Sequence, residues 1–171
     1  MTGSSLPEVW LRGPLPGVPA LLQPIAHALT QAREDVNAWM IDFPDTVLWE
    51  RPAGVASVAF HLQHLTGVID RMFTYARAQA LTEQQLEALA AEGKTTPGLK
   101  ATVLLQQFND RVTRALEEIK TLPEDILTQP RTVGRQHLPS TVIGLLVHAA
   151  EHTQRHAGQL YVTLRIVNSK R

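Results

Sequence analysis

Residues 140–167, STVIGLLVHAAEHTQRHAGQLYVTLRIV, carry the pattern that decides the fold. Apolar residues recur along this stretch at the period of an α-helix, and on a helical wheel they cluster on one face. That face comprises Val142, Leu145, Ala149, Leu160, Leu164 and Val167. We therefore predict a long amphipathic helix over residues 140–167, with this face turned into a core of other helices.

Three more stretches, at about residues 19–43, 57–80 and 99–121, are predicted to be helical. Ser57 is a favourable N-cap for the second of them. Proline and glycine break the chain between the stretches, and no stretch shows a convincing strand pattern. Four long helices without strands predict an all-α protein with the architecture of a four-helix bundle.

The connection between the second and third long helices, residues 81–98, is long enough to run back along the bundle. Thr82 and Gln85 fit a capping box, which predicts a short extra helix that ends at Gly93. A connection of this length would leave the second and third long helices parallel. The expected order is therefore up-down-down-up.

The chain has 171 residues, which is typical of one domain that buries its own core. Residues 1–18 are rich in proline and glycine and are expected to form an extended arm. Trp10 and Leu11 in this arm have no obvious place in a core of four helices. We therefore expect that the arm helps to form a homodimer.

The composition limits the partners and the chemistry that we expect. Sixteen basic residues balance sixteen acidic ones, which argues against nucleic-acid binding and against a polybasic membrane surface. The N-terminus shows no pattern of a signal peptide, and a cytoplasmic location is expected. The chain has no cysteine, so neither a disulfide nor a catalytic thiolate can come from the protein itself.

Five of the seven histidines fall in two helical segments: His61 and His64 in the second helix, and His148, His152 and His156 in the fourth. Neutral imidazole is the commonest metal ligand in proteins at physiological pH. Without cysteine, a tight transition-metal site must use histidine together with carboxylates or water. The clustering therefore predicts a metal site between the second and fourth helices.

Helix geometry selects two of the three histidines on the fourth helix. His148 and His156 lie roughly 12 Å apart along the axis, too far to share one ion with bonds of about 2.0–2.1 Å. Only neighbouring histidines can share an ion, and the helical wheel places His152 and His156 nearest the apolar face. His148 is expected at the rim. A zincin-type protease is excluded, because Thr153 stands where its catalytic glutamate would follow the first histidine.

The third ligand has two candidates on the second helix. His61 and His64 both avoid the polar stripe formed by Gln63, Thr66, Asp70, Thr74 and Arg77. Periodicity alone slightly favours His61, which lies near the middle of the apolar arc. Both histidines remain candidates at this point.

Two segments resemble the signature helices of the DinB-like superfamily, namely SVAFHLQHLTGVIDRMFTYA at residues 57–76 and LLVHAAEHTQRHAGQLYVTLRI at residues 145–166. This superfamily includes damage-inducible DinB proteins and bacterial thiol S-transferases of the bacillithiol and mycothiol type. The resemblance implies a four-helix bundle in up-down-down-up order. It also implies a metal, commonly nickel or zinc, held by three histidines and water. By motif position these ligands are His64, His152 and His156.

The resemblance also implies a carboxylate shortly after the histidine of the second helix, but Thr66 and Gly67 stand there. Asp70 and Glu151 are the alternatives. Arg71 and Arg155 are candidate anchors for an anionic substrate.

The expected function is that of a metal-dependent enzyme acting on a small molecule. Three histidines leave coordination positions open, as in catalytic sites. Transfer of an external low-molecular-weight thiol to an electrophile, or hydrolysis with water, fits such a site. The alternative is a non-catalytic metal-binding or stress-response protein on the same scaffold. A third reading is that the histidines are structural and bind no metal.

Overall fold

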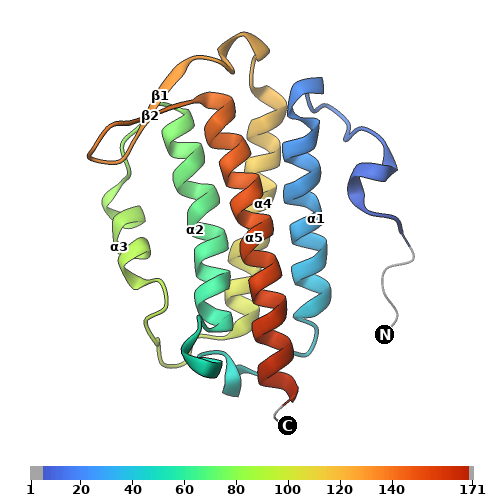
Figure 1. Ribbon diagram of the computed structural model, residues 1–171, viewed down its shortest axis with the longest axis vertical. Helices are drawn as coiled ribbons and strands as arrows, with labels where there is room; N and C mark the ends of the chain where they lie inside the picture. The colour runs from blue at the N-terminus through green and yellow to red at the C-terminus, as the bar shows by residue number, and fades with distance from the viewer. Residues whose placement is uncertain (1–5, 170–171) are drawn as a thin grey trace.

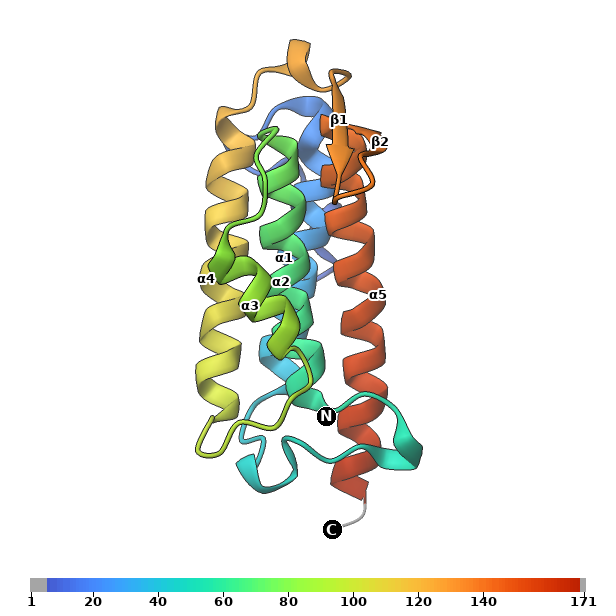
Figure 2. The ribbon, with the colours of Figure 1, turned by 90° about the vertical axis from the view of Figure 1, so that its left-hand side faces the viewer.

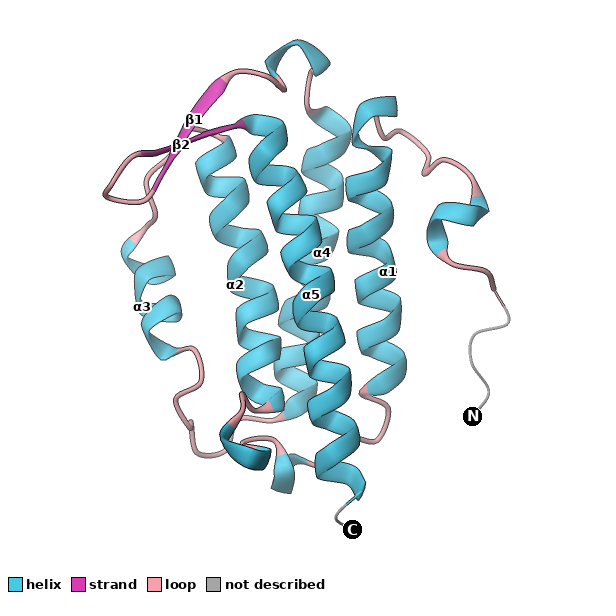
Figure 3. Cartoon of the chain, in the orientation of Figure 1, coloured by secondary structure: helices cyan, strands magenta, loops and turns pink. Residues whose placement is uncertain are grey.

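The computed structural model describes residues 6–169, and its main feature is a bundle of four long helices (Figures 1 and 3). These are α1 (Gln23–Trp39), α2 (Val58–Ala76), α4 (Ala101–Thr121) and α5 (Val142–Ser169). Helices α1 and α5 run in one direction, and α2 and α4 run in the opposite direction (Figures 1 and 2). The predicted all-α bundle with up-down-down-up order is therefore confirmed.

Each of α1 and α2 packs against both α4 and α5, and the core lies between these four helices. The predicted apolar face of α5 is buried at every position, as are large side chains of the other helices such as Leu29, Phe73 and Phe108. Burying a side chain of this size contributes about 1.5–3 kcal/mol to folding. Within the described part of the chain, no helix has the length and apolar character needed to cross a membrane.

Helices α1 and α2 are shorter than predicted. Residues Ala20–Leu22 form a 3-10 turn before α1. After α1, Asp42 takes a left-handed conformation with a φ of 53°, and Ala78 does the same after α2 with a φ of 58°. A left-handed residue cannot continue an α-helix, and Ala78 directly follows the C-cap of α2. Neither residue is a glycine, so the sequence gives little sign of these ends.

The predicted short helix in the long connection is present as α3 (Glu83–Ala91), and its capping box of Thr82 and Gln85 is formed. Helix α3 lies outside the bundle, alongside α2 (Figure 2), and none of its residues is buried. Gln85 Nε2 donates to Asp70 Oδ2 at 2.6 Å and to Thr74 Oγ1 at 2.8 Å, both on α2. Polar contacts therefore hold the start of α3 to the bundle.

A β-hairpin precedes α5, and its two strands were not predicted. Strand β1 (Pro130–Val133) pairs antiparallel with strand β2 (Leu138–Thr141). Each strand has only four residues and each contains a proline, which cannot donate to a ladder and is unusual in strands. The expectation of helices without strands was therefore wrong for this short stretch.

The N-terminal arm is not extended throughout. Its residues Val9–Arg12 form a 3-10 helix, in which Val9 is buried and donates its backbone N–H to Gln31 Oε1 on α1. Trp10 and Leu11 point away from the core, and Trp10 is 62% exposed. Residues 1–5 of the arm lie outside the described residues. The homodimer stays a prediction.

Candidate metal centre

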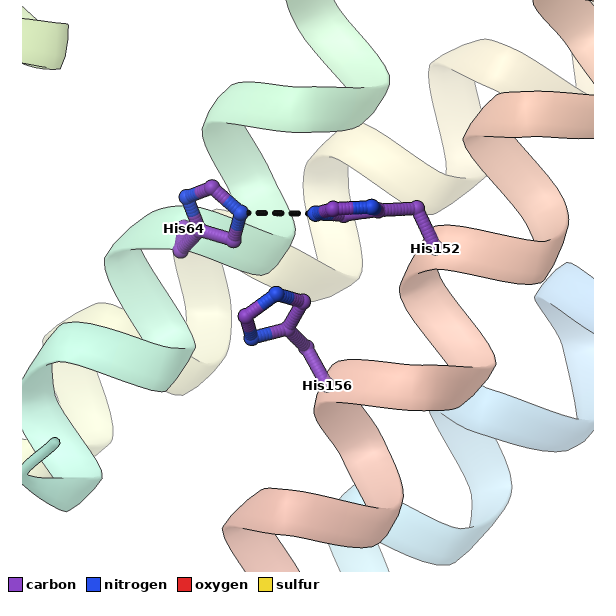
Figure 4. Close-up of side chains that lie close together, drawn as sticks. All are labelled: His64, His152 and His156. Atoms are coloured by element: carbon purple, nitrogen blue, oxygen red, sulfur yellow. Dashed lines mark hydrogen bonds between the residues drawn. The ribbon is translucent and has the colours of Figure 1, made fainter. Parts of the chain in front are cut away.

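Helices α2 and α5 bring three histidines together, His64 from α2 and His152 and His156 from successive turns of α5 (Figure 4). One ring nitrogen of each lies within 4.8 Å of the other two. His64 Nε2 and His152 Nε2 are 2.9 Å apart, and the ring centre of His156 lies 4.3 Å from that of His64. The three residues that the motif selects form one cluster.

The spacing between His64 Nε2 and His152 Nε2 is close to that of two nitrogens bound to one metal ion. Bonds of 2.0–2.1 Å in a tetrahedral shell place two ligand nitrogens roughly 3.3 Å apart. At 2.9 Å, one of the paired nitrogens of His64 and His152 must carry a proton, and an ion would take the place of that proton. His152 Nδ1 is buried and makes no hydrogen bond with the described residues. Unpaired buried polar atoms cost about 1–3 kcal/mol, so they need an explanation such as a functional role.

The cluster keeps two of its imidazoles neutral. Burial, followed by electrostatic repulsion from His64, lowers the pKa of His152 below its ordinary value. The same two causes lower the pKa of His156 to about 4. Metal binding requires the neutral form, because a protonated nitrogen has no lone pair to donate. Both residues are therefore ready to bind a cation near pH 7.

His61 lies deeper in the bundle than the cluster and is only 3% exposed. Its Nδ1 is 3.3 Å from His156 Nδ1, and burial lowers its pKa to about 4. His61 therefore contacts the cluster through His156 without joining it. Periodicity indicates burial, and His61 is indeed the more buried of the two candidates. The motif indicates His64, which lies at the cluster.

His148 lies at the rim, as predicted, with 48% of its side chain exposed. Its Nδ1 is 3.1 Å from Glu151 Oε1, and Glu151 also pairs with Arg155 at 2.7 Å. His148, Glu151 and His152 form a second group whose potential ligand atoms lie within 4.8 Å of one another. His152 is shared by both groups, so it occupies the central position.

The carboxylate next to the cluster is Glu92, which sequence reasoning missed. Glu92 Oε2 lies 2.6 Å from His64 Nδ1, and Arg71 donates to Glu92 Oε1 at 2.7 Å. Burial by itself would raise the pKa of Glu92, but the hydrogen bonds from His64 and Arg71 outweigh it and hold the pKa below its usual value. The only signal in the sequence is weak: Glu92 follows the last turn of α3, where the helix dipole disfavours a carboxylate.

The two carboxylates considered from the sequence have other partners. Asp70 pairs with Arg111 and accepts from Gln85. Glu151 lies at the surface with Arg155 and His148. Of the two candidate anion anchors, Arg71 is buried and paired with Glu92, so it is not accessible to a substrate. Arg155 is exposed.

This arrangement can be compared with known proteins. The sequence model of the DinB superfamily matches residues 28–160. The chain belongs to the DinB superfamily. The match runs from within α1 to within α5 and includes all three clustered histidines. No curated protein matches the chain.

A cavity of about 700 Å³ lies between α3, the end of α2 and the hairpin of this DinB-superfamily protein. Its walls include the apolar side chains of Tyr75, Leu86 and Leu89 and the basic side chains of Arg131 and Arg135. None of the three clustered histidines lines it. The cavity has the size of a small-molecule site, but it does not adjoin the histidine cluster.

Proposed function

We propose that this protein binds a divalent transition-metal ion, nickel or zinc, through His64, His152 and His156, and that the ion acts on a small molecule. The observation that carries the proposal is the convergence of three imidazole nitrogens within 4.8 Å. Membership of the DinB superfamily supports it. The chain has no cysteine, so the donor set is nitrogen-rich, which suits nickel and zinc.

When bound, such an ion supplies Lewis acidity and lowers the pKa of an external thiol or water. Three histidine ligands leave at least one position open for that molecule. The thiol must be a small cosubstrate, because the chain offers none. Phe60 stacks on His64 with ring centres 5.2 Å apart, so an apolar ring covers one side of that ligand. The proposed reaction is transfer of the thiol to an electrophile, or hydrolysis.

A second candidate function is metal binding without catalysis, in a stress-response or metal-handling role. The position of the cavity between α3 and the hairpin favours it, since none of the three histidines lines that cavity. An enzyme needs room for its substrate beside the reacting centre. A turnover assay therefore separates the two functions.

Metal analysis tests the site. We expect wild-type protein purified without a histidine tag to hold about one equivalent of nickel or zinc. His64→Ala should lose it, because the Nε2 that faces His152 is removed. His61→Ala should keep it, because His61 contacts only His156 within the cluster. Loss of metal from His61→Ala together with retention by His64→Ala would reverse our choice of ligand.

Turnover tests the reaction. Metal-loaded protein should speed the addition of bacillithiol, mycothiol or another small thiol to a chromogenic electrophile, measured by absorbance. Loss of Lewis-acid stabilisation worth several kcal/mol should slow the reaction in His152→Ala on the order of a hundredfold. Equal rates for wild-type and variant protein, with metal present in the wild type, would favour the non-catalytic function.

A further inference from the structure

Glu92 links the histidine cluster to a segment outside the four-helix bundle. It bridges His64 and Arg71 of α2, with hydrogen-bond distances of 2.6 and 2.7 Å. The side chains of Glu92 and Arg71 are only 8% and 9% exposed. A buried ion pair of this kind is worth little by itself, but it is costly to break and fixes the position of its members.

Gly67 provides the space that Glu92 and Arg71 occupy. A Cβ atom at Gly67 would lie 2.5 Å from Arg71 Nη1 and 2.6 Å from Glu92 Oε1. Glycine inside a helix costs about 1 kcal/mol relative to alanine, so its presence here needs a reason. The missing side chain is that reason. The resemblance leads us to expect a carboxylate just after His64. Instead, the carboxylate of Glu92, the residue that follows α3, occupies the space beside Gly67.

The end of α3 is held to α2 around the same histidine. Gly93 donates its backbone N–H to Gln63 Oε1 at 2.9 Å. Gly93 has a φ of +78°, and a Cβ atom there would lie 3.1 Å from the ring of Phe60, which stacks on His64. Because no residue of α3 is buried, these polar contacts fix the segment more than apolar packing does.

The contact sets the chemical state of His64. A carboxylate at Nδ1 keeps the proton on that nitrogen, which leaves the lone pair of Nε2 facing His152. His152 Nε2 then donates to His64, and its own Nδ1 is left as an unpaired acceptor. A carboxylate behind a ligand histidine also makes the ligand more basic, and its loss typically weakens metal binding 10–100-fold.

We propose that Glu92 is a positioning residue that fixes the Nδ1–H tautomer of His64, and that it couples metal binding to the docking of residues 82–93 on α2. The coupling follows from linkage, since a contact that favours metal binding is itself favoured when metal is bound. This inference rests on the proposed metal site for its second half. Its first half concerns the metal-free protein and stands separately.

The tautomer is measured on metal-free protein from the ¹⁵N resonances of the His64 ring. We expect wild-type His64 to carry its proton on Nδ1, and Glu92→Ala to give a mixture or the Nε2–H form. Gly67→Ala keeps the carboxylate but displaces it, so it should shift the tautomer in the same direction. A wild-type tautomer in both variants would overturn the proposal. Gly67→Ala also covers the case in which Glu92→Ala, with Arg71 left unpaired, does not fold.

Metal affinity and hydrogen exchange test the coupling. By competition with a chelator, Glu92→Ala and Gly67→Ala should bind zinc or nickel about 10–100-fold more weakly than the wild type. Metal should slow amide exchange in residues 83–93 of the wild type and not of Glu92→Ala. Unchanged affinity or unchanged exchange would refute the coupling. Wild-type protein that binds no metal would end the proposed function and the coupling, while the tautomer would still decide the role of Glu92.

Two matched controls isolate the effect. Glu87→Ala removes an exposed carboxylate of α3, so the charge change is the same as in Glu92→Ala. Gly158→Ala adds a methyl group to α5, where nothing lies within 4 Å of the new Cβ atom. Both should leave metal affinity and the His64 tautomer unchanged, and Gly158→Ala should stabilise the helix by up to about 1 kcal/mol. A loss of affinity in either control as large as in Glu92→Ala would also overturn the proposal.

Discussion

His152→Ala protein should bind no stoichiometric metal, whereas His148→Ala protein should bind nearly as much as the wild type. His152 is the central histidine, 2.9 Å from His64 and one helical turn from His156. His148 is exposed and pairs with Glu151 at the surface. If three ligands share a binding free energy of about 10–16 kcal/mol, removing one costs about 3–5 kcal/mol, or roughly a thousandfold in affinity. Elemental analysis of both variants, purified without a tag, measures the difference.

The second group of potential ligands makes this comparison decisive. His148, Glu151 and His152 also lie close enough to hold an ion. If they formed the site, His148→Ala would lose metal as completely as His152→Ala, and His64→Ala would keep it. If the ion binds to His64, His152 and His156, His64→Ala should lose the metal and His148→Ala should keep it. Only His152 is common to the two groups, so His64→Ala and His148→Ala together identify the site.

The fold follows largely from the sequence because helix periodicity is a local signal. Every apolar position chosen on α5 is buried, and the capping box of Thr82 and Gln85 is formed. The helix ends are less predictable. Asp42 and Ala78 adopt left-handed conformations that ordinary propensities disfavour, so tertiary packing must impose them. The hairpin was missed because its strands are short and each contains a proline.

For the candidate site, the sequence indicates the histidines on α2 and α5 but not the carboxylate beside them. Helical geometry pairs His152 with His156, and the motif adds His64. Glu92 lies 28 residues after His64 in the chain, and its contact depends on the path that the connection takes back along α2. No local pattern encodes that path. On α2, Gly67 is the residue related to that path, because its missing side chain leaves the space that Glu92 occupies.

Metal-free protein should lose stability as the pH falls from about 6.5 to about 4, because His61 and His156 are neutral in the folded state. Burial lowers both pKa values to about 4, whereas histidine in the unfolded chain titrates near 6.5. Between these values the unfolded chain binds more protons than the folded chain. The free energy of unfolding therefore decreases as the pH decreases. The stabilisation is complete above pH 6.5, and no further loss from these groups follows below pH 4. For the buried His61 the loss is about 3 kcal/mol.

Urea unfolding of metal-free protein at several pH values between 7.5 and 4 measures this loss. His61→Leu removes one titrating group while keeping an apolar side chain in the core, so its stability should depend less on pH than that of the wild type. An identical pH dependence for both proteins would show that His61 is not the group responsible.

Bound metal should add a second pH dependence in the same direction. Metal stabilises the folded state by mass action, provided that the unfolded chain binds it more weakly. Protons compete for the same lone pairs, so the gain in melting temperature should be large near pH 7.5 and shrink toward about pH 5. The lowered pKa values of His152 and His156 favour metal over protons, so part of the gain should persist below pH 6.5. Melting curves with and without chelator at pH 7.5, 6 and 5 measure the gain. An equal effect of chelator at pH 7.5 and 5 would mean that histidines do not hold the ion.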